Sequence, residues 1–360
     1  MLSRTADHLF WMARYTERAE NTARMLDVRV QYSLMPQSEQ AEQQGWRTML
    51  GVSELVQQFD AKYDTLNQKN VIDFMVRDPD NPSSIASCLR AARENARAVR
   101  GTLTTEVWET ENTTWLMLQE HLRSRMFEHD PSQFLEWVKY RSHMSRGVTL
   151  GTMFQDEAFN FIRLGTFLER ADNTARILDV KFRFLASETV QAGAQGEFYY
   201  LAALLRSVSA FEIYRKVYRD TITPPRVASL LILQEKMPRS LVACMAAVVA
   251  NLRDVRNDLS HDTERKAEEL YAMLQSASVA DILQEGLHEF LTRFLASVDE
   301  LGNGISRDFL IPIDPVASEE VPASAQTQTQ TQTQTQTGAQ SQTGTQSQTG
   351  TQSQTQTQTR

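Results

Sequence analysis

The chain has only two cysteines in 360 residues, and they form no Cys-x-x-Cys pair. Cys88 falls in an expected helix and Cys244 in an apolar run, so we interpret both as structural thiols in a reducing compartment. The start of the chain lacks the basic stretch and apolar core of a secretory signal. The most apolar stretch, 241–252, is too short to span a bilayer. These absences predict a cytoplasmic protein.

Positive charge is also scarce. Lys and Arg number 37 against 45 Asp and Glu, which gives a net charge of −8. Arg360 is the only charge from Ala323 onward, so the rest of the chain carries −9. No run of basic residues stands out, whereas nucleic acids and anionic membranes are bound through clustered Lys and Arg. We therefore expect neither nucleic acid nor membrane as a partner.

Nucleotide-binding and hydrolase motifs are missing as well. The chain contains no GxxxxGK[ST], GxGxxG, HExxH or GxSxG. Neither cysteine sits in a recognisable nucleophile motif. The sequence therefore predicts no bound cofactor, and it favours a non-catalytic protein while leaving catalysis open.

Strand signals are absent and helix signals are abundant. Before about residue 310, Gly and Pro are sparse and apolar residues recur every three or four positions, which predicts an all-α, multi-helix bundle. Ser83-Ser84 and Asp130-Pro131 are expected to begin helices. The expected helices span 3–33, 46–68, 83–101, 103–126, 131–145, 152–187, 197–219, 225–235, 238–254, 263–275 and 279–303.

One polar word of thirteen residues occurs twice, 152 positions apart. It reads Thr16-Glu-Arg-Ala-Glu-Asn-Thr-Ala-Arg-Met-Leu-Asp-Val28 and then Leu168-Glu-Arg-Ala-Asp-Asn-Thr-Ala-Arg-Ile-Leu-Asp-Val180, with ten identical positions. The word predicts two pseudo-repeats, about 1–145 and 152–305, within a helical domain of residues 1–312. The Gln/Thr-rich segment 323–360 cannot bury enough apolar surface to fold, so we expect it to be disordered.

On a helical wheel, both copies place a polar cluster within an apolar stripe. The two clusters are Glu17, Asn21 and Arg24 in the first copy, and Glu169, Asn173 and Arg176 in the second. Apolar residues continue the stripe on both sides, so these charges are expected to be buried, and buried charges must be paired.

We expect the two motif helices to meet, with Arg24 pairing with Glu169 and Arg176 with Glu17. Arg18 and Arg170 lie about 100° further round the helix, where they would face a cleft or a second acidic partner. Two interpretations stay open. The network either fixes the register of the bundle, or lines a pocket that holds a carboxylate, peptide or phosphate through arginine.

The first copy follows an N-terminal Leu2-Ser-Arg and the segment Leu9-Phe-Trp-Met-Ala-Arg-Tyr15. This combination resembles the bacterial alpha-E domain family, which is all-helical and named for a Glu-Arg motif. Glu17-Arg18 and Glu169-Arg170 are the matching positions. The segments Ser209-Ala-Phe-Glu-Ile-Tyr-Arg215 and Pro238-Arg-Ser-Leu241 are similar to the family too, and the resemblance covers about residues 1–312.

The resemblance implies a setting rather than a reaction. Such domains are typically encoded or fused beside a circularly permuted ATP-grasp ligase and a transglutaminase-like cysteine peptidase, which act on peptides. We therefore expect an accessory or scaffold module that binds one of these partner enzymes or a peptide substrate. The alternative is an enzyme whose Glu-Arg clusters perform acid–base chemistry on a peptide or amide.

A metal-binding bundle is the weaker rival. Di-iron helical bundles use two Glu-x-x-His pairs and two further carboxylates. Here Glu285 and His288 form one such pair, and Asp258 and His261 form an Asp-x-x-His analogue. Because one acid–His pair at this spacing arises readily by chance, no metal site is predicted.

Overall fold

The computed structural model describes residues 1–35 and 38–310, with the side chains of 184–195 left aside. Every regular element within these residues is a helix, which confirms the all-α prediction. No helix among them is long and apolar enough to cross a membrane. The tail predicted at 323–360 lies outside the described residues.

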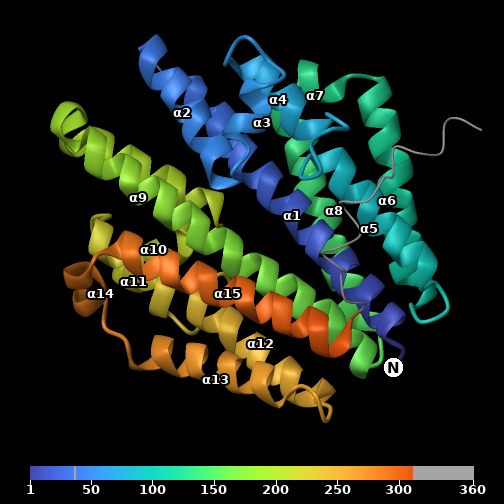
Figure 1. Ribbon diagram of the computed structural model, residues 1–360. Coiled ribbons are helices and arrows are strands. Elements are labelled where there is room, and N and C mark those ends of the chain that lie inside the picture. The colour runs from blue at the N-terminus through green and yellow to red at the C-terminus, as the bar shows by residue number, and fades with distance from the viewer. Residues whose placement is uncertain (36–37, 311–360) are drawn as a thin grey trace, which may run out of the picture. The chain divides into compact units, whose positions relative to one another are not determined.

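Two long helices, α1 (Ser3–Ser33) and α9 (Glu157–Ser207), form the centre of the fold. They run side by side in the same direction (Figure 1). They approach each other closely at Gly165, where an added Cβ would stand 2.2 Å from the carbonyl oxygen of Phe10. The missing side chain at Gly165 therefore lets the two backbones come together at the level just before both copies of the polar word.

Helices of the first half pack around α1. α5 and α8 contact it directly, and α6 packs against both of them. α2 reaches across to α9, so the first half also touches the second central helix. The bounds are α2 Glu39–Val52, α3 Val56–Asp60, α4 Gln68–Val76, α5 Ile85–Ala98, α6 Thr105–Arg123, α7 Met126–His129 and α8 Pro131–Thr152.

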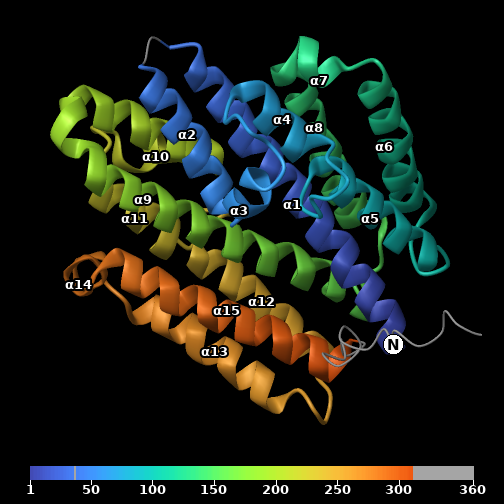
Figure 2. The same ribbon diagram turned by 45° about the horizontal axis from the view of Figure 1, so that its top comes forward.

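Helices of the second half pack on the other side of α9. α12 and α15 contact it directly, and α13 packs against both of these (Figure 2). The bounds are α10 Phe211–Tyr218, α11 Pro224–Leu233, α12 Leu241–Val255, α13 His261–Ser276, α14 Val279–Glu285 and α15 Leu287–Phe309.

Helix starts follow the capping chemistry read from the sequence. The Ser84 hydroxyl accepts from the backbone N–H of Ser87, and the Asp130 carboxylate accepts from Gln133. Both predicted starts are confirmed. α12 begins at Leu241 rather than at 238, because Ser240 is its N-cap and accepts from Ala243.

Several stretches differ from the expected helices, three of them in the number of helices or breaks. The region 46–68, expected as one helix, contains the second half of α2, the short α3 and the first residue of α4. The two helices expected within 152–219 are one continuous α9 up to Ser207, followed by α10. The helix expected over 279–303 is broken at Gly286, whose φ of +114° is open to glycine and strained for other residues.

Candidate functional site: a reciprocal Glu-Arg network

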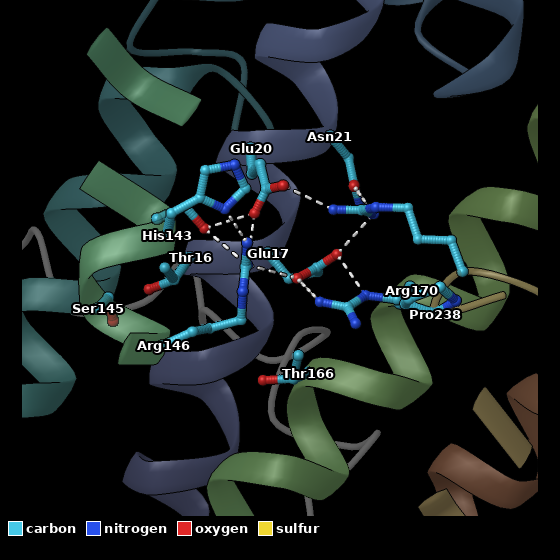
Figure 3. A network of polar contacts seen from close by, with 12 residues as sticks. Thr16, Glu17, Glu20, Asn21, His143, Ser145, Arg146, Thr166, Arg170 and Pro238 are labelled. Atoms are coloured by element: carbon cyan, nitrogen blue, oxygen red, sulfur yellow. Dashed lines mark hydrogen bonds and ion pairs between the residues drawn. The ribbon is translucent and has the colours of Figure 1, made fainter. Parts of the chain in front are cut away.

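The two Glu-Arg pairs of the repeated word bind each other across the α1–α9 contact. Arg170 donates from Nε and Nη2 to the two carboxylate oxygens of Glu17, at 3.0 and 2.9 Å (Figure 3). Arg18 does the same to Glu169, at 2.6 and 3.0 Å. Glu17 is 1% exposed and Glu169 is 5% exposed, so the predicted burial of the motif carboxylates is confirmed.

This exchange follows from parallel helices that carry the same word at the same level. Each glutamate faces the arginine that follows its counterpart on the other helix, and the planar guanidinium fork matches both carboxylate oxygens. Arg18 and Arg170 were expected to face a cleft or a second acidic partner. The acidic partner is the glutamate of the opposite copy.

The expected pairing of Arg24 with Glu169 and of Arg176 with Glu17 was wrong. Arg24 donates from Nε to Glu20 at 2.8 Å, one turn away on the same helix. Arg176 donates to Asp172 at 2.9 Å in the same i, i+4 relation. Residues four apart already lie within reach on one helix face, so these arginines find carboxylates without crossing to the other helix.

Arg239 also belongs to the network, although its sequence context predicted no role for it. It lies in the turn before α12, is 6% exposed, and donates to Glu17 and Asn21, both at 2.8 Å. Its second terminal nitrogen donates to Glu20 at 2.6 Å. The signal was within the segment Pro238-Arg-Ser-Leu241, which carried part of the family resemblance.

Arg146 on α8 was missed as well. It donates from Nη1 to Glu17 at 3.0 Å and also forms an ion pair with Glu20. Ser142, one turn earlier on α8, donates to Glu20 at 2.7 Å. Only tertiary packing brings α8 here, so no local sequence pattern pointed to it.

The second copy is held less tightly. Glu169 accepts a hydrogen bond from Arg14 Nε at 2.8 Å in addition to those from Arg18. Both arginines are partly exposed. Asn173, predicted to be buried with its cluster, is half-buried, and Arg176 reaches outward to the exposed Glu54. The Glu17 end of the network is therefore the more enclosed of the two.

Nearby arginines keep the carboxylates of Glu17 and Glu169 ionised. Burial by itself would raise the pKa of Glu17, but the guanidiniums of Arg170, Arg239 and Arg146 outweigh it and hold the pKa at about 2. Burial is likewise outweighed for Glu169, whose pKa is lowered by Arg14 and Arg18. A carboxylate with a depressed pKa has no proton to donate at neutral pH and is a weak base, so this arrangement is poorly suited to acid–base catalysis.

A pocket of about 270 Å³ adjoins the enclosed end of the network. Glu17, Arg146 and Arg170 form part of its wall, so the network both locks the helices and contributes charge to a cavity. The remaining lining residues come from α1, α8 and α9, and they are Met12, Ala13, Thr16, Ser145, Thr149, Leu150, Phe159, Ile162, Arg163, Thr166 and Phe167.

The weak metal candidates are engaged elsewhere. Glu285 forms an ion pair with Arg293, and His288 Nδ1 lies 2.5 Å from Asp179. Asp258 and His261 belong to the turn before α13 and to its first residue. Within residues 1–35 and 38–310, no three His, Cys, Asp or Glu side chains gather as a metal centre would require.

Both cysteines are buried, and each occupies the same local setting. The Cys88 thiol donates to the carbonyl of Pro82, and the Cys244 thiol to that of Pro238. Burial raises the pKa of each thiol to about 12. Neither is a thiolate nucleophile at neutral pH, in accord with a structural role.

The chain matches a known family over most of its length. Residues 1–310 match the model of Alpha-E, described as a predicted alpha-helical domain with a conserved ER motif. The chain belongs to the Alpha-E family. In this Alpha-E chain, both occurrences of the Glu-Arg word lie at the contact between the two longest helices, which gives the motif a structural role.

Curated relatives of this Alpha-E chain occur in mycobacteria. An uncharacterized protein of Mycobacterium bovis and one of Mycobacterium tuberculosis strain CDC 1551 are each 25% identical to it over 329 residues. Each match covers 82% of this chain and 35% of the relative, so the chain spans about a third of their length. No solved structure matches.

Proposed function

We propose that this Alpha-E domain is a non-catalytic accessory module of an ATP-grasp peptide-ligase system that also includes a transglutaminase-like peptidase. It binds a partner enzyme or the peptide on which that enzyme acts. The observation that carries the non-catalytic part is the ion pairing of the buried Glu17 and Glu169, each held by at least two guanidiniums and each with a lowered pKa. An acid–base enzyme needs a carboxylate that can exchange its proton near neutral pH.

Two further observations support a module that works beside other proteins. The chain resembles domains that are encoded or fused next to ATP-grasp and peptidase partners. It also matches about a third of each longer mycobacterial relative, as expected for a unit that is joined to other segments.

The α8 surface offers a face for such a partner. Tyr140, Met144 and Leu150 on α8 are exposed, and Phe154 in the loop that follows is 83% exposed. Exposed apolar side chains gathered on one element are typical of protein interaction sites. We assign partner binding to this face.

Co-purification tests the proposal. The full chain, tagged and expressed in its native cells, is expected to recover an ATP-grasp protein. A Tyr140→Ser/Phe154→Ser variant should recover less of it. The matched control is Leu259→Ser, because Leu259 is 72% exposed but lies in the turn before α13. If no ATP-grasp protein is recovered while both genes are expressed, the proposal is wrong.

A further inference from the structure

The pocket between α1, α8 and α9 has more positive than negative charge around it. Glu17 and Glu20 are the two carboxylates of the enclosed network. Four guanidiniums contact one or both of them, which leaves an excess of two positive charges. The four guanidiniums belong to Arg24, Arg146, Arg170 and Arg239.

His143 leaves this excess of positive charge unchanged because it is neutral. Burial lowers its pKa, so the imidazole is neutral at neutral pH. One ring nitrogen lies 3.1 Å from Arg24 and the other 2.7 Å from Arg146. A neutral imidazole has one acceptor nitrogen, so it can accept from only one of these two arginines.

Arg163 adds a further positive charge directly in the pocket wall. Its guanidinium stands over the rings of Phe159 and Phe167, at 5.6 and 4.9 Å from their centroids. Among the described residues, Arg163 makes no ion pair with a carboxylate and no hydrogen bond. Burial, followed by the positive charge of Arg170, lowers the pKa of Arg163. A half-buried arginine beside another arginine is stabilised by an anion between or above them.

The rest of the wall is largely apolar. Met12, Ala13, Leu150 and Ile162 provide aliphatic surface, and the two phenylalanine rings that flank Arg163 provide aromatic surface. A volume of about 270 Å³ is near the lower end of the range of roughly 300–1,000 Å³ typical of small-molecule sites. The cavity therefore suits a compact group with one charged end and an apolar body.

We propose that this pocket binds an organic carboxylate with an apolar side group, such as the C-terminal end of a peptide. Arg163 holds the carboxylate and the apolar wall holds the side group. This inference rests on the proposed binding role of the domain, but it does not depend on which enzyme is the partner.

The first experiment compares charged and neutral probes on the full wild-type chain. By calorimetry in low salt, 3-phenylpropionate is expected to bind at least about tenfold more tightly than 3-phenylpropionamide, which has the same apolar body without the charge. Inorganic phosphate should bind more weakly than 3-phenylpropionate because it has no apolar body. Equal binding of acid and amide would overturn the proposal, and so would tighter binding of phosphate.

The second experiment tests the residue. Arg163→Met keeps an unbranched apolar stem and removes the charge, and it should weaken 3-phenylpropionate binding by about tenfold while leaving the amide unaffected. Arg206→Met is the matched control. Arg206 lies on the same helix and also stacks on an aromatic ring, that of Phe211 at 4.2 Å, but it is outside the pocket. If Arg163→Met binds 3-phenylpropionate as tightly as the wild-type chain does, the acid binds at another site and the proposal is overturned.

The two proposals fail separately. Loss of probe binding in Arg163→Met with normal recovery of an ATP-grasp protein supports the pocket and leaves the partner surface intact. If no ATP-grasp protein is recovered but the acid still binds selectively, the proposed partner is contradicted and the proposed carboxylate pocket is supported. The comparison of acid with amide uses the wild-type chain, so the test does not depend on the folding of a variant.

Discussion

Arg170 donates to both carboxylate oxygens of Glu17 at the contact between α1 and α9, a bidentate arrangement that suits the planar guanidinium fork. Two more arginines reach the same carboxylate from α8 and from the turn before α12. Glu17 thus joins four segments that are far apart in the chain. Glu17 therefore contributes both to the stability of the domain and to the wall of the proposed pocket.

Replacement of Glu17 should cost far more than replacement of Glu169. Glu17→Gln leaves three guanidiniums, those of the buried Arg170 and Arg239 and of the partly exposed Arg146, facing a neutral amide, for a loss of roughly 3–5 kcal/mol in the free energy of unfolding. Glu169→Gln should cost less, about 1–3 kcal/mol, since its arginines are partly exposed. Urea unfolding measures both. Glu120→Gln is the control, because its pair with Arg123 is exposed and should contribute nothing measurable. Equal losses at the two motif glutamates would contradict the difference in enclosure.

Arg239 should not tolerate lysine. A lysine keeps the charge but cannot bond Glu17, Glu20 and Asn21 together, so Arg239→Lys is expected to cost about 1–3 kcal/mol of unfolding free energy. Arg226→Lys is a suitable comparison, since Arg226 makes an exposed pair with Asp220. A thermal melt that shows no difference between the two variants would mean that the fork geometry at Arg239 is unimportant.

Gly165 should be sensitive to an added methyl group. In Gly165→Ala the new Cβ meets the Phe10 carbonyl oxygen and pushes α1 away from α9, at a cost of about 1–3 kcal/mol. Gly147→Ala on α8 has no atom within 4 Å of the new Cβ, and it should gain about 0.5–1 kcal/mol from reduced backbone freedom. Opposite shifts of the urea midpoint are the expected result, and a harmless Gly165→Ala would argue against so close a helix contact.

The enclosed network also predicts an acid-sensitive fold. The pKa of Glu17 is lowered from 4.5 to about 2, so its contribution to stability is complete above about pH 4.5 and is lost as the pH falls toward 2. Unfolding free energy measured across this range should fall in the wild-type chain and fall less steeply in Glu17→Gln. Parallel pH profiles would show that Glu17 is not the group that titrates.

Local residue patterns were sufficient for most of the helices and for the burial of the two motif glutamates. The span of α1, the caps at Ser84 and Asp130, and an all-α fold follow from short-range periodicity and hydrogen-bond chemistry. An apolar stripe on both sides of Glu17 was enough to place its carboxylate inside. Helix ends were less predictable within α9, where no strong breaker separates the two expected segments.

Partner identity, in contrast, was decided by tertiary structure. The sequence supplied two copies of a Glu-Arg word, but only the parallel packing of α1 on α9 made Arg170 the partner of Glu17 in place of the expected Arg176. Arg146 and Arg239 joined because other segments packed there, which no spacing within the word encodes. A helix period fixes which residues share a face, whereas the direction and closeness of the facing helix determine which charges meet.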